Sequence, residues 1–210
     1  MELVKNNMEK NNIVAKIKED ALNSHVPILQ DKSLEFIRLI LRLINPKDIL
    51  EIGTAVGYSA INFVLELDEN VKVKTIERNE KMYNKAIENI TSVNLSDKIE
   101  VVLADATEYL PNLAEENKYD VVFIDAAKGQ YLKFLENAIR LVKDGGVIIA
   151  DNVLFKGRVL SDYNEHKHRT AVNRLRDYIA IINEDERLKS TVLDIGDGIA
   201  VSKVNKSTRK

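Results

Sequence analysis

Three polar side chains that could hold a metal ion follow two apolar runs of the sequence. Asp125 follows the run 120–124, and Asp151 with Asn152 follows the run 146–150. If these runs are neighbouring parallel strands, their carboxyl ends meet at one sheet edge and the three oxygen donors converge there. Two carboxylates and an amide, without His or Cys, suit Mg²⁺, with Mn²⁺ or Ca²⁺ as substitutes. Each residue alone would be an ordinary strand-end cap, but their joint occurrence favours a metal site.

Such a metal site could activate a hydroxyl group. Three protein ligands leave open positions on an octahedral ion, which a substrate with two adjacent oxygens can fill. Coordination lowers the pKa of a bound hydroxyl and makes it a nucleophile. Lys128 lies three residues after Asp125, where we expect it to act as general base on that hydroxyl. The alternative for Lys128 is a solvated lysine on a turn.

A glycine-bearing turn at residues 51–59 (EIGTAVGYS) follows the first apolar run and could bind a nucleotide-like cofactor. Glycine at such a turn lets a ligand approach the backbone closely. The turn departs from the dinucleotide pattern Gly-x-Gly-x-x-Gly, because Ala55 and Tyr58 stand where that pattern has glycine. The residues predicted to contact a cofactor here are Gly53, Thr54, Gly57 and Ser59.

Two further acids end the next two predicted strands. Glu77 stands 24 residues after Gly53. A carboxylate there can accept hydrogen bonds from both ribose hydroxyls of NAD or of S-adenosylmethionine. Asp105 and Ala106 end the third strand, where they would meet the adenine ring. The alternative is that Glu77 and Asp105 are helix N-caps or solvated loop acids.

An α/β scaffold must position these residues. From Lys47 onward, short β-rich apolar runs alternate with longer helical patterns, which is typical of a parallel sheet with crossover helices. The last two strands are separated only by residues 196–198, a gap that permits a hairpin but not a parallel crossover. We therefore predict a Rossmann-like α/β fold with a seven-stranded, mostly parallel sheet, an antiparallel last strand, and helices on both faces. The predicted strands are 48–53, 71–77, 99–105, 119–126, 146–151, 190–195 and 199–204. Helices are predicted to start near Gly57, Asn79, Ala106 and Gln130, and a further helix is predicted over Arg169–Glu184.

Residues 1–46 are predicted to form an N-terminal helical cap or dimerisation segment ahead of the α/β domain at 47–204, in a single domain overall. One helix is expected near residues 12–23, and a second can be capped by Ser33. These helices carry more apolar surface than a lone lid needs, so we expect a homodimer. Residues 205–210 are expected to be a frayed basic tail.

The composition limits the classes of protein that this chain can belong to. The formal net charge of −2 over 210 residues provides no whole-surface basic field for nucleic acid. The absence of cysteine excludes disulfides, thiolate zinc sites and a Cys nucleophile. No apolar run approaches the roughly 18 residues of a membrane span, and the N-terminus is polar. A cytoplasmic protein without a membrane partner is therefore expected.

Residues 51–59, 124–131 (IDAAKGQY) and 150–154 (ADNVL) resemble the metal-dependent O-methyltransferases related to catechol and caffeoyl-CoA O-methyltransferases. The resemblance covers nearly the whole chain, and it implies methyl transfer from S-adenosylmethionine to a metal-bound hydroxyl. It also implies roles for individual residues. These are metal ligation by Asp125, Asp151 and Asn152, catalysis by Lys128 and Asp125, ribose binding by Glu77, and cofactor contacts from Asp125 and from Val26 in an N-terminal gate.

Residues 125–131 and 151–159 are most similar to the bacterial branch that methylates 5-hydroxyuridine at the tRNA wobble position, giving 5-methoxyuridine. The 5-hydroxyl and 4-carbonyl of that base are adjacent oxygens, and bases in RNA loops can be read individually. A tRNA anticodon loop would need cations for its phosphates. The candidates are Lys156, Arg158, Lys167, Arg169, Arg174 and Arg176. The alternative interpretation is that these cations lie on an ordinary solvated loop and helix face and bind no RNA.

Three other functions compete with tRNA methylation. A small-molecule O-methyltransferase acting on catechol-like phenols shares every core motif and differs only in the substrate lip. An NAD(P)-dependent oxidoreductase is disfavoured by the missing glycine pattern and by the terminal hairpin. A non-catalytic binding module that kept the fold is disfavoured by the full set of polar strand-end residues.

Overall fold

A seven-stranded sheet with one reversed strand forms the centre of the molecule. The computed structural model describes residues 2–67, 70–162 and 165–206. The strands are β1 (Asp48–Ile52), β2 (Lys72–Glu77), β3 (Ile99–Leu103), β4 (Tyr119–Ile124), β5 (Val142–Ala150), β6 (Leu188–Leu193) and β7 (Ile199–Val204). They lie in the order β3-β2-β1-β4-β5-β7-β6, and β7 runs antiparallel to both of its neighbours. The predicted mostly parallel sheet with an antiparallel last strand is therefore confirmed.

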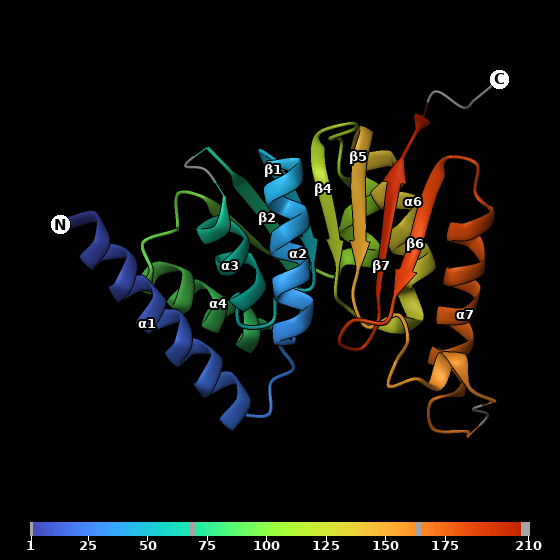
Figure 1. Cartoon of the computed structure of the whole chain (residues 1–210), viewed down its shortest axis with the longest axis horizontal. Coiled ribbons are helices and arrows are strands. Elements are labelled where there is room, and N and C mark those ends of the chain that lie inside the picture. The colour runs from blue at the N-terminus through green and yellow to red at the C-terminus, as the bar shows by residue number, and fades with distance from the viewer. Residues whose placement is uncertain (1, 68–69, 163–164, 207–210) are drawn as a thin grey trace.

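Helices cover both faces of this sheet (Figure 1). One face packs against α1 (Glu2–Asn23), α2 (Asp31–Ile44), α3 (Tyr58–Glu66) and α4 (Glu80–Ser92). The other packs against α5 (Ala106–Asn112), α6 (Tyr131–Leu141) and α7 (Arg169–Glu184). Successive strand residues point to opposite faces, so Ile49 joins the first apolar core and Leu50 joins the second. The near-continuous apolar runs of β1 and β4 follow from burial on both sides.

Several strands end earlier than the sequence predicts. β1 ends at Ile52, β3 at Leu103 and β4 at Ile124, so Gly53, Asp105 and Asp125 lie in the loops beyond. The side chains of Asp105 and Asp125 therefore lie at the carboxyl edge of the sheet, although the N–H of Asp125 still donates to the carbonyl of Ile52 at 3.0 Å. β5 instead begins earlier than predicted, at Val142, and its register against β4 shifts before Val147. The predicted helix over Arg169–Glu184 is confirmed as α7.

The N-terminal segment differs from the prediction in two respects. Helix α1 starts at Glu2 rather than near residue 12. The prediction that Ser33 caps the second helix is wrong: α2 begins at Asp31, after an extended Gln30, and the N–H of Leu34 donates to the carbonyl of Gln30 at 2.8 Å. Ser33 is fully buried in the first turn of α2, with its hydroxyl 3.5 Å from Oδ1 of Asp151.

The end of the described chain is fastened to the sheet. The N–H of Asn205 donates to the carbonyl of Arg187 at 2.7 Å, and Nζ of Lys206 donates to the carbonyl of Val142 at 2.6 Å. The prediction of a frayed tail is therefore wrong for residues 205 and 206, because Nζ of Lys206 donates hydrogen bonds to the carbonyls of Arg140 and Val142 at the start of β5. Residues 207–210 of the predicted tail lie outside the described residues. Within the described chain, no helix is long and apolar enough to cross a membrane.

Candidate active site

A cavity of about 320 Å³ lies at the carboxyl ends of β1, β2 and β4. This is the edge at which open α/β sheets bind ligands. The predicted site residues that line it are Gly53, Thr54, Ser59, Glu77, Asp105, Ala106, Asp125, Lys128 and Asn152. Three others lie elsewhere. Asp151 is fully buried behind the wall, Gly57 faces Ala86 of α4, and Val26 lines a separate hollow between α1 and α4.

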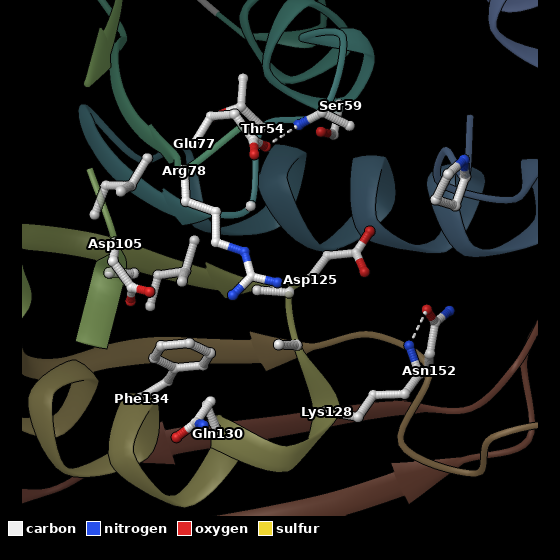
Figure 2. Close-up of a pocket in the computed structure, with 18 of the residues that line it drawn as sticks. Thr54, Ser59, Glu77, Arg78, Asp105, Asp125, Lys128, Gln130, Phe134 and Asn152 are labelled. Carbon is white, nitrogen blue, oxygen red and sulfur yellow. Dashed lines mark hydrogen bonds between the residues drawn. The ribbon is translucent and has the colours of Figure 1, made fainter. Parts of the chain in front are cut away.

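The polar groups of the cavity fall into two sets (Figure 2). In that view Glu77 and Asp105 lie at one end, and Lys128 and Asn152 lie at the other, with the carboxylate of Asp125 between them. In the first set, Glu77 is the last residue of β2 and Asp105 follows β3; the second set follows β4 and β5. Strand order therefore separates the acids predicted to hold a nucleoside from the residues predicted to hold a metal ion.

Gly53 is required by the protein's own backbone. It has a φ of +101°, and a Cβ atom there would lie 2.0 Å from the carbonyl oxygen of Asp125. The two strand-end loops therefore approach each other at a distance that only glycine permits. Gly53 thus fixes the position of Asp125 beside the cofactor turn and also lines the cavity, and its contact with a cofactor stays a prediction.

The two acids at the first end of the cavity are already hydrogen bonded. The carboxylate of Glu77 accepts from the N–H of Ala55 at 2.9 Å and from the N–H of Asn79 at 2.8 Å. Asp105 is the N-cap of α5, which was the alternative interpretation of this residue from the sequence. Its carboxylate accepts from the N–H and the hydroxyl of Thr107. These bonds to Thr107 lower the pKa of Asp105. A carboxylate offers about four acceptor positions, so both acids keep capacity for a ligand.

The predicted metal residues lie together because β4 and β5 are neighbours. Nζ of Lys128 donates to Oδ1 of Asn152 at 3.1 Å, and Nδ2 of Asn152 donates to Oδ2 of Asp151 at 2.9 Å. Burial raises the pKa of Asp151 to about 7, and the charge of Asp125 adds to the rise. Burial also raises the pKa of Asp125, against the influence of Lys128.

This donor set fits a hard divalent cation. Burial makes the carboxyl groups of Asp125 and Asp151 difficult to ionise. A bound divalent cation would stabilise their negative charges and so offset the free-energy cost of ionising them. In the described part of the chain, no group of three His, Cys, Asp or Glu side chains could hold a metal ion. A metal at this site would therefore depend on the Asn152 amide, and on water or substrate for its remaining ligands.

Several lining residues were missed by sequence reasoning. Arg78 reaches into the cavity between the two polar sets (Figure 2), and Phe134 of α6 and residues 27–29 complete its wall. Nothing in the spacing of Phe134 and residues 27–29 marks them, because the chain returns to the site from α6 and from the α1–α2 connection. Arg78 directly follows Glu77, but the sequence does not show that its side chain turns into the cavity. Glu51 was also missed, although an acid within an apolar strand is a visible signal. It is fully buried and bonds to Ser59 and Thr75.

The six predicted RNA-binding cations have different environments. Arg176 donates to the carbonyls of Val159 and Arg158, and so holds the 3-10 turn Arg158–Leu160 in place. Arg174 pairs with Asp177 at 3.9 Å. Arg158 lies over the Phe155 ring at 5.1 Å, and Nζ of Lys128 lies 5.6 Å from the same ring. Lys156, Lys167 and Arg169 are exposed. Of the six, the structure brings Arg158 to the neighbourhood of Lys128.

Comparison with known proteins gives consistent matches. The family model described as O-methyltransferase matches residues 5–205. Caffeoyl-CoA O-methyltransferase 1 of Eucalyptus globulus is 33% identical, over 80% of this chain and 70% of its own length. Catechol O-methyltransferase of Niastella koreensis is 33% identical, over 77% and 72%. The crystal structure of the Bacillus cereus O-methyltransferase in complex with SAH superposes with a TM-score of 0.81, at 28% identity, over 92% of this chain and 91% of that one.

Proposed function

Because the chain belongs to the O-methyltransferase family, we propose that it transfers the methyl group of S-adenosylmethionine to one of two adjacent oxygens on a small, catechol-like molecule. The observation that carries this proposal is the cavity with nucleoside-type acids at one end and a lysine beside an acid–amide cluster at the other. Methyl donor and acceptor would then meet near Asp125, and their alignment would supply much of the rate enhancement.

The cofactor fits the end of the cavity formed by β1, β2 and β3. We assign the ribose to Glu77, whose carboxylate is held in place by two backbone N–H groups. We assign the adenine to the loop at Asp105 and Ala106, and the amino-acid part to the turn from Gly53 to Ser59. In support, the related Bacillus cereus enzyme binds SAH, the demethylated cofactor, on the same fold.

At the other end, Asp125, Asp151 and Asn152 would hold Mg²⁺. When bound, such an ion lowers the pKa of a substrate hydroxyl. We assign to Lys128, whose Nζ lies 3.1 Å from Oδ1 of Asn152, the role of taking the proton that this hydroxyl would lose. Attack of this oxygen on the methyl carbon of bound S-adenosylmethionine would break the carbon–sulfur bond and release S-adenosylhomocysteine.

A wobble-position 5-hydroxyuridine in tRNA is the second candidate substrate. One observation favours it: Arg158, stacked on Phe155, and the exposed Lys156 follow Asn152 closely, where RNA phosphates would pass. Two of the predicted cations weigh against it, since Arg176 and Arg174 already have intramolecular partners. The names of the curated relatives also indicate small phenolic substrates. We therefore place the small molecule first.

A transfer assay with labelled S-adenosylmethionine separates the two substrates. We expect methylation of an ortho-dihydroxyphenol, none of the matching para-dihydroxyphenol, and none of tRNA that lacks the modification. Activity should vanish in EDTA and return with Mg²⁺. Transfer to tRNA alone would establish the second candidate, and full activity in EDTA would refute the metal.

A double substitution of the exposed cations, Lys156→Ala with Arg169→Ala, provides the matched control. It should leave phenol methylation unchanged. If RNA is the substrate, the same variant should lose affinity for tRNA and show a weaker dependence of binding on salt.

A further inference from the structure

Glu51 is a buried acid that the proposed reaction does not use. It lies in β1 on the face that packs against α3, with no exposed surface. The hydroxyl of Ser59 bonds to Oε1 of Glu51, and the hydroxyl of Thr75 bonds to Oε2 at 2.5 Å. Among the residues that the structure describes, Glu51 forms no ion pair. In the described part of the chain, the hydrogen bonds to this carboxyl come from two hydroxyl groups.

These contacts continue to a fourth residue and form a hydroxyl chain, Thr54–Thr75–Glu51–Ser59. Oγ1 of Thr75 lies 2.6 Å from Oγ1 of Thr54. The two inner members, Thr75 and Glu51, have no exposed surface, whereas the two ends, Thr54 and Ser59, line the cavity. Figure 2 shows both ends on the same side of the cavity, near Glu77. The chain therefore meets a ligand only at its two ends.

The number of protons in the hydroxyl chain decides what its ends can offer. An ionised Glu51 can only accept, so Ser59 and Thr75 must both donate to it. The proton of Thr75 is then used, so Thr54 must donate to Thr75. Three protons fill three contacts, and both ends present only lone pairs to the cavity.

A neutral Glu51 adds a fourth proton to the same three contacts. One hydroxyl proton is then left over, and reversing the direction of donation moves it to an end of the chain. The cavity gains a single O–H donor, at Ser59 or at Thr54. The protonation state of Glu51 thus decides whether this part of the cavity wall can donate a hydrogen bond to a ligand or can only accept one.

The surroundings of Glu51 favour its neutral form. Burial raises the pKa of Glu51 to about 8, although its bonds to Ser59 and Thr75 oppose the rise. The acids that face it add to the rise: Asp125 beyond β4 and Glu77 at the end of β2. The α3 residue in contact with it, Ser59, carries no charge. The neutral form of Glu51 is therefore the favoured one at pH 7.

We propose that neutral Glu51 is a positioning residue for the cofactor, turning one hydroxyl proton of Ser59 or Thr54 into the cavity to bind the carboxylate of the cofactor's amino-acid part. This rests on the proposed function, because it takes the cavity to be the site of S-adenosylmethionine. Since the ligand binds the neutral form, its affinity is full below the pKa of Glu51 and falls as the pH rises through it.

Two ligands and one isosteric variant test the proposal. S-adenosylhomocysteine carries the amino-acid carboxylate, and 5′-methylthioadenosine lacks it. Calorimetry between about pH 7 and 9.5 should show the affinity of the wild-type protein for S-adenosylhomocysteine falling about tenfold, the value of one hydrogen bond to a charged group. The affinity for 5′-methylthioadenosine should stay constant.

Glu51→Gln is the matched variant, because an amide donates one N–H into the chain and leaves one hydroxyl proton spare at every pH. It should bind S-adenosylhomocysteine at pH 7 as the wild type does and lose the part of the pH dependence that Glu51 causes. The ionisation of the ligand's own amino group is common to both proteins, so the difference between them isolates Glu51.

The outcomes are distinct. If neither ligand binds at pH 7, the proposed function fails. If both bind and lose affinity in parallel as the pH rises, or if Glu51→Gln keeps the wild-type profile, the role of Glu51 alone is refuted. If the variant does not fold, decarboxylated S-adenosylhomocysteine, which keeps the amino group and lacks only the carboxylate, is the control on the wild-type protein. An equal fall in affinity for this ligand and for S-adenosylhomocysteine would refute the role of Glu51.

Discussion

The carboxylate of Asp197 accepts a hydrogen bond from the backbone N–H of Lys156, and so the turn between β6 and β7 holds the loop that follows β5. The carbonyl of Asp197 also accepts from the N–H of Leu154 at 3.0 Å. The held loop contains left-handed backbone at Asn152, Phe155 and Lys156, with φ between +46° and +57°. Such conformations persist only where the surroundings enforce them. The last hairpin therefore fixes the loop that carries a proposed metal ligand.

Asp197→Ala should release this loop. Trypsin should cleave after Lys156 faster than in the wild type, because loss of a hydrogen bond to a charged acceptor costs about 1.5–3 kcal/mol of local stability. Asp197→Asn keeps an acceptor oxygen and should restore most of the protection. The KM for the phenol should rise in Asp197→Ala, while the affinity for S-adenosylhomocysteine stays unchanged. Equal cleavage rates in all three proteins would show that the hairpin does not hold the loop.

The raised pKa of Asp151 predicts how stability depends on pH in the metal-free protein. The folded state holds a proton on Asp151 up to about pH 7, whereas the unfolded chain releases it near the ordinary value of 3.8. The free energy of unfolding should therefore fall as the pH rises from about 4 to about 7. Asp151→Asn removes the part of this slope that Asp151 causes, while Glu51 and Asp125 still contribute theirs. The variant should be more stable than the wild type at pH 8, by up to about 4 kcal/mol.

Thermal unfolding at pH 4 and pH 8 measures this difference. Mg²⁺ should raise the melting temperature of the wild type at pH 8 and have little effect on Asp151→Asn, because the variant loses one proposed metal ligand. A variant that is less stable than the wild type at pH 8 would mean that Asp151 is ionised and stabilising without a metal.

Gly53→Ala should be strongly destabilising. The substitution places a side chain at positive φ and a Cβ atom 2.0 Å from the carbonyl oxygen of Asp125. We expect a loss of more than about 2 kcal/mol in the free energy of unfolding, measured by denaturant titration. Gly129→Ala is the control, since a Cβ atom there meets nothing within 4 Å. If the two variants unfold alike, the close approach of the two loops is not a constraint.

The exposed side of α2 gives the predicted homodimer a specific test. Leu39 and Leu43 are 48% and 74% exposed on this helix. If a second copy covers them, Leu43→Glu should shift the mass measured by light scattering from that of a dimer to that of a monomer. Leu160→Glu, at a leucine that is 72% exposed beside α7, is the control. A wild-type protein that is already monomeric would refute the homodimer.

Local patterns were sufficient to predict the fold, because each strand and crossover helix has its own periodicity. The convergence of Asp125 and Asn152 also followed, since neighbouring parallel strands end at one edge. Arg78 and Phe134 could not be predicted, because their place in the cavity depends on side-chain direction and on the packing of α6. Ser33 was misassigned for a related reason. Its residue type fits a helix cap, but tertiary packing buries it against Asp151.

Lys128 offers a test that separates proton transfer from charge. Lys128→Met should lower kcat by about 10²–10⁴, the usual contribution of a general base. Lys128→Arg keeps the positive charge beside Asn152 but has no accessible neutral form, so it should be equally slow. Both variants should bind S-adenosylhomocysteine normally, because the cofactor's assigned residues lie at the other end of the cavity. Lys133→Met, at an exposed lysine of α6, should keep wild-type kcat. Recovery of activity in Lys128→Arg would show that the lysine acts by charge alone and that another group takes the proton.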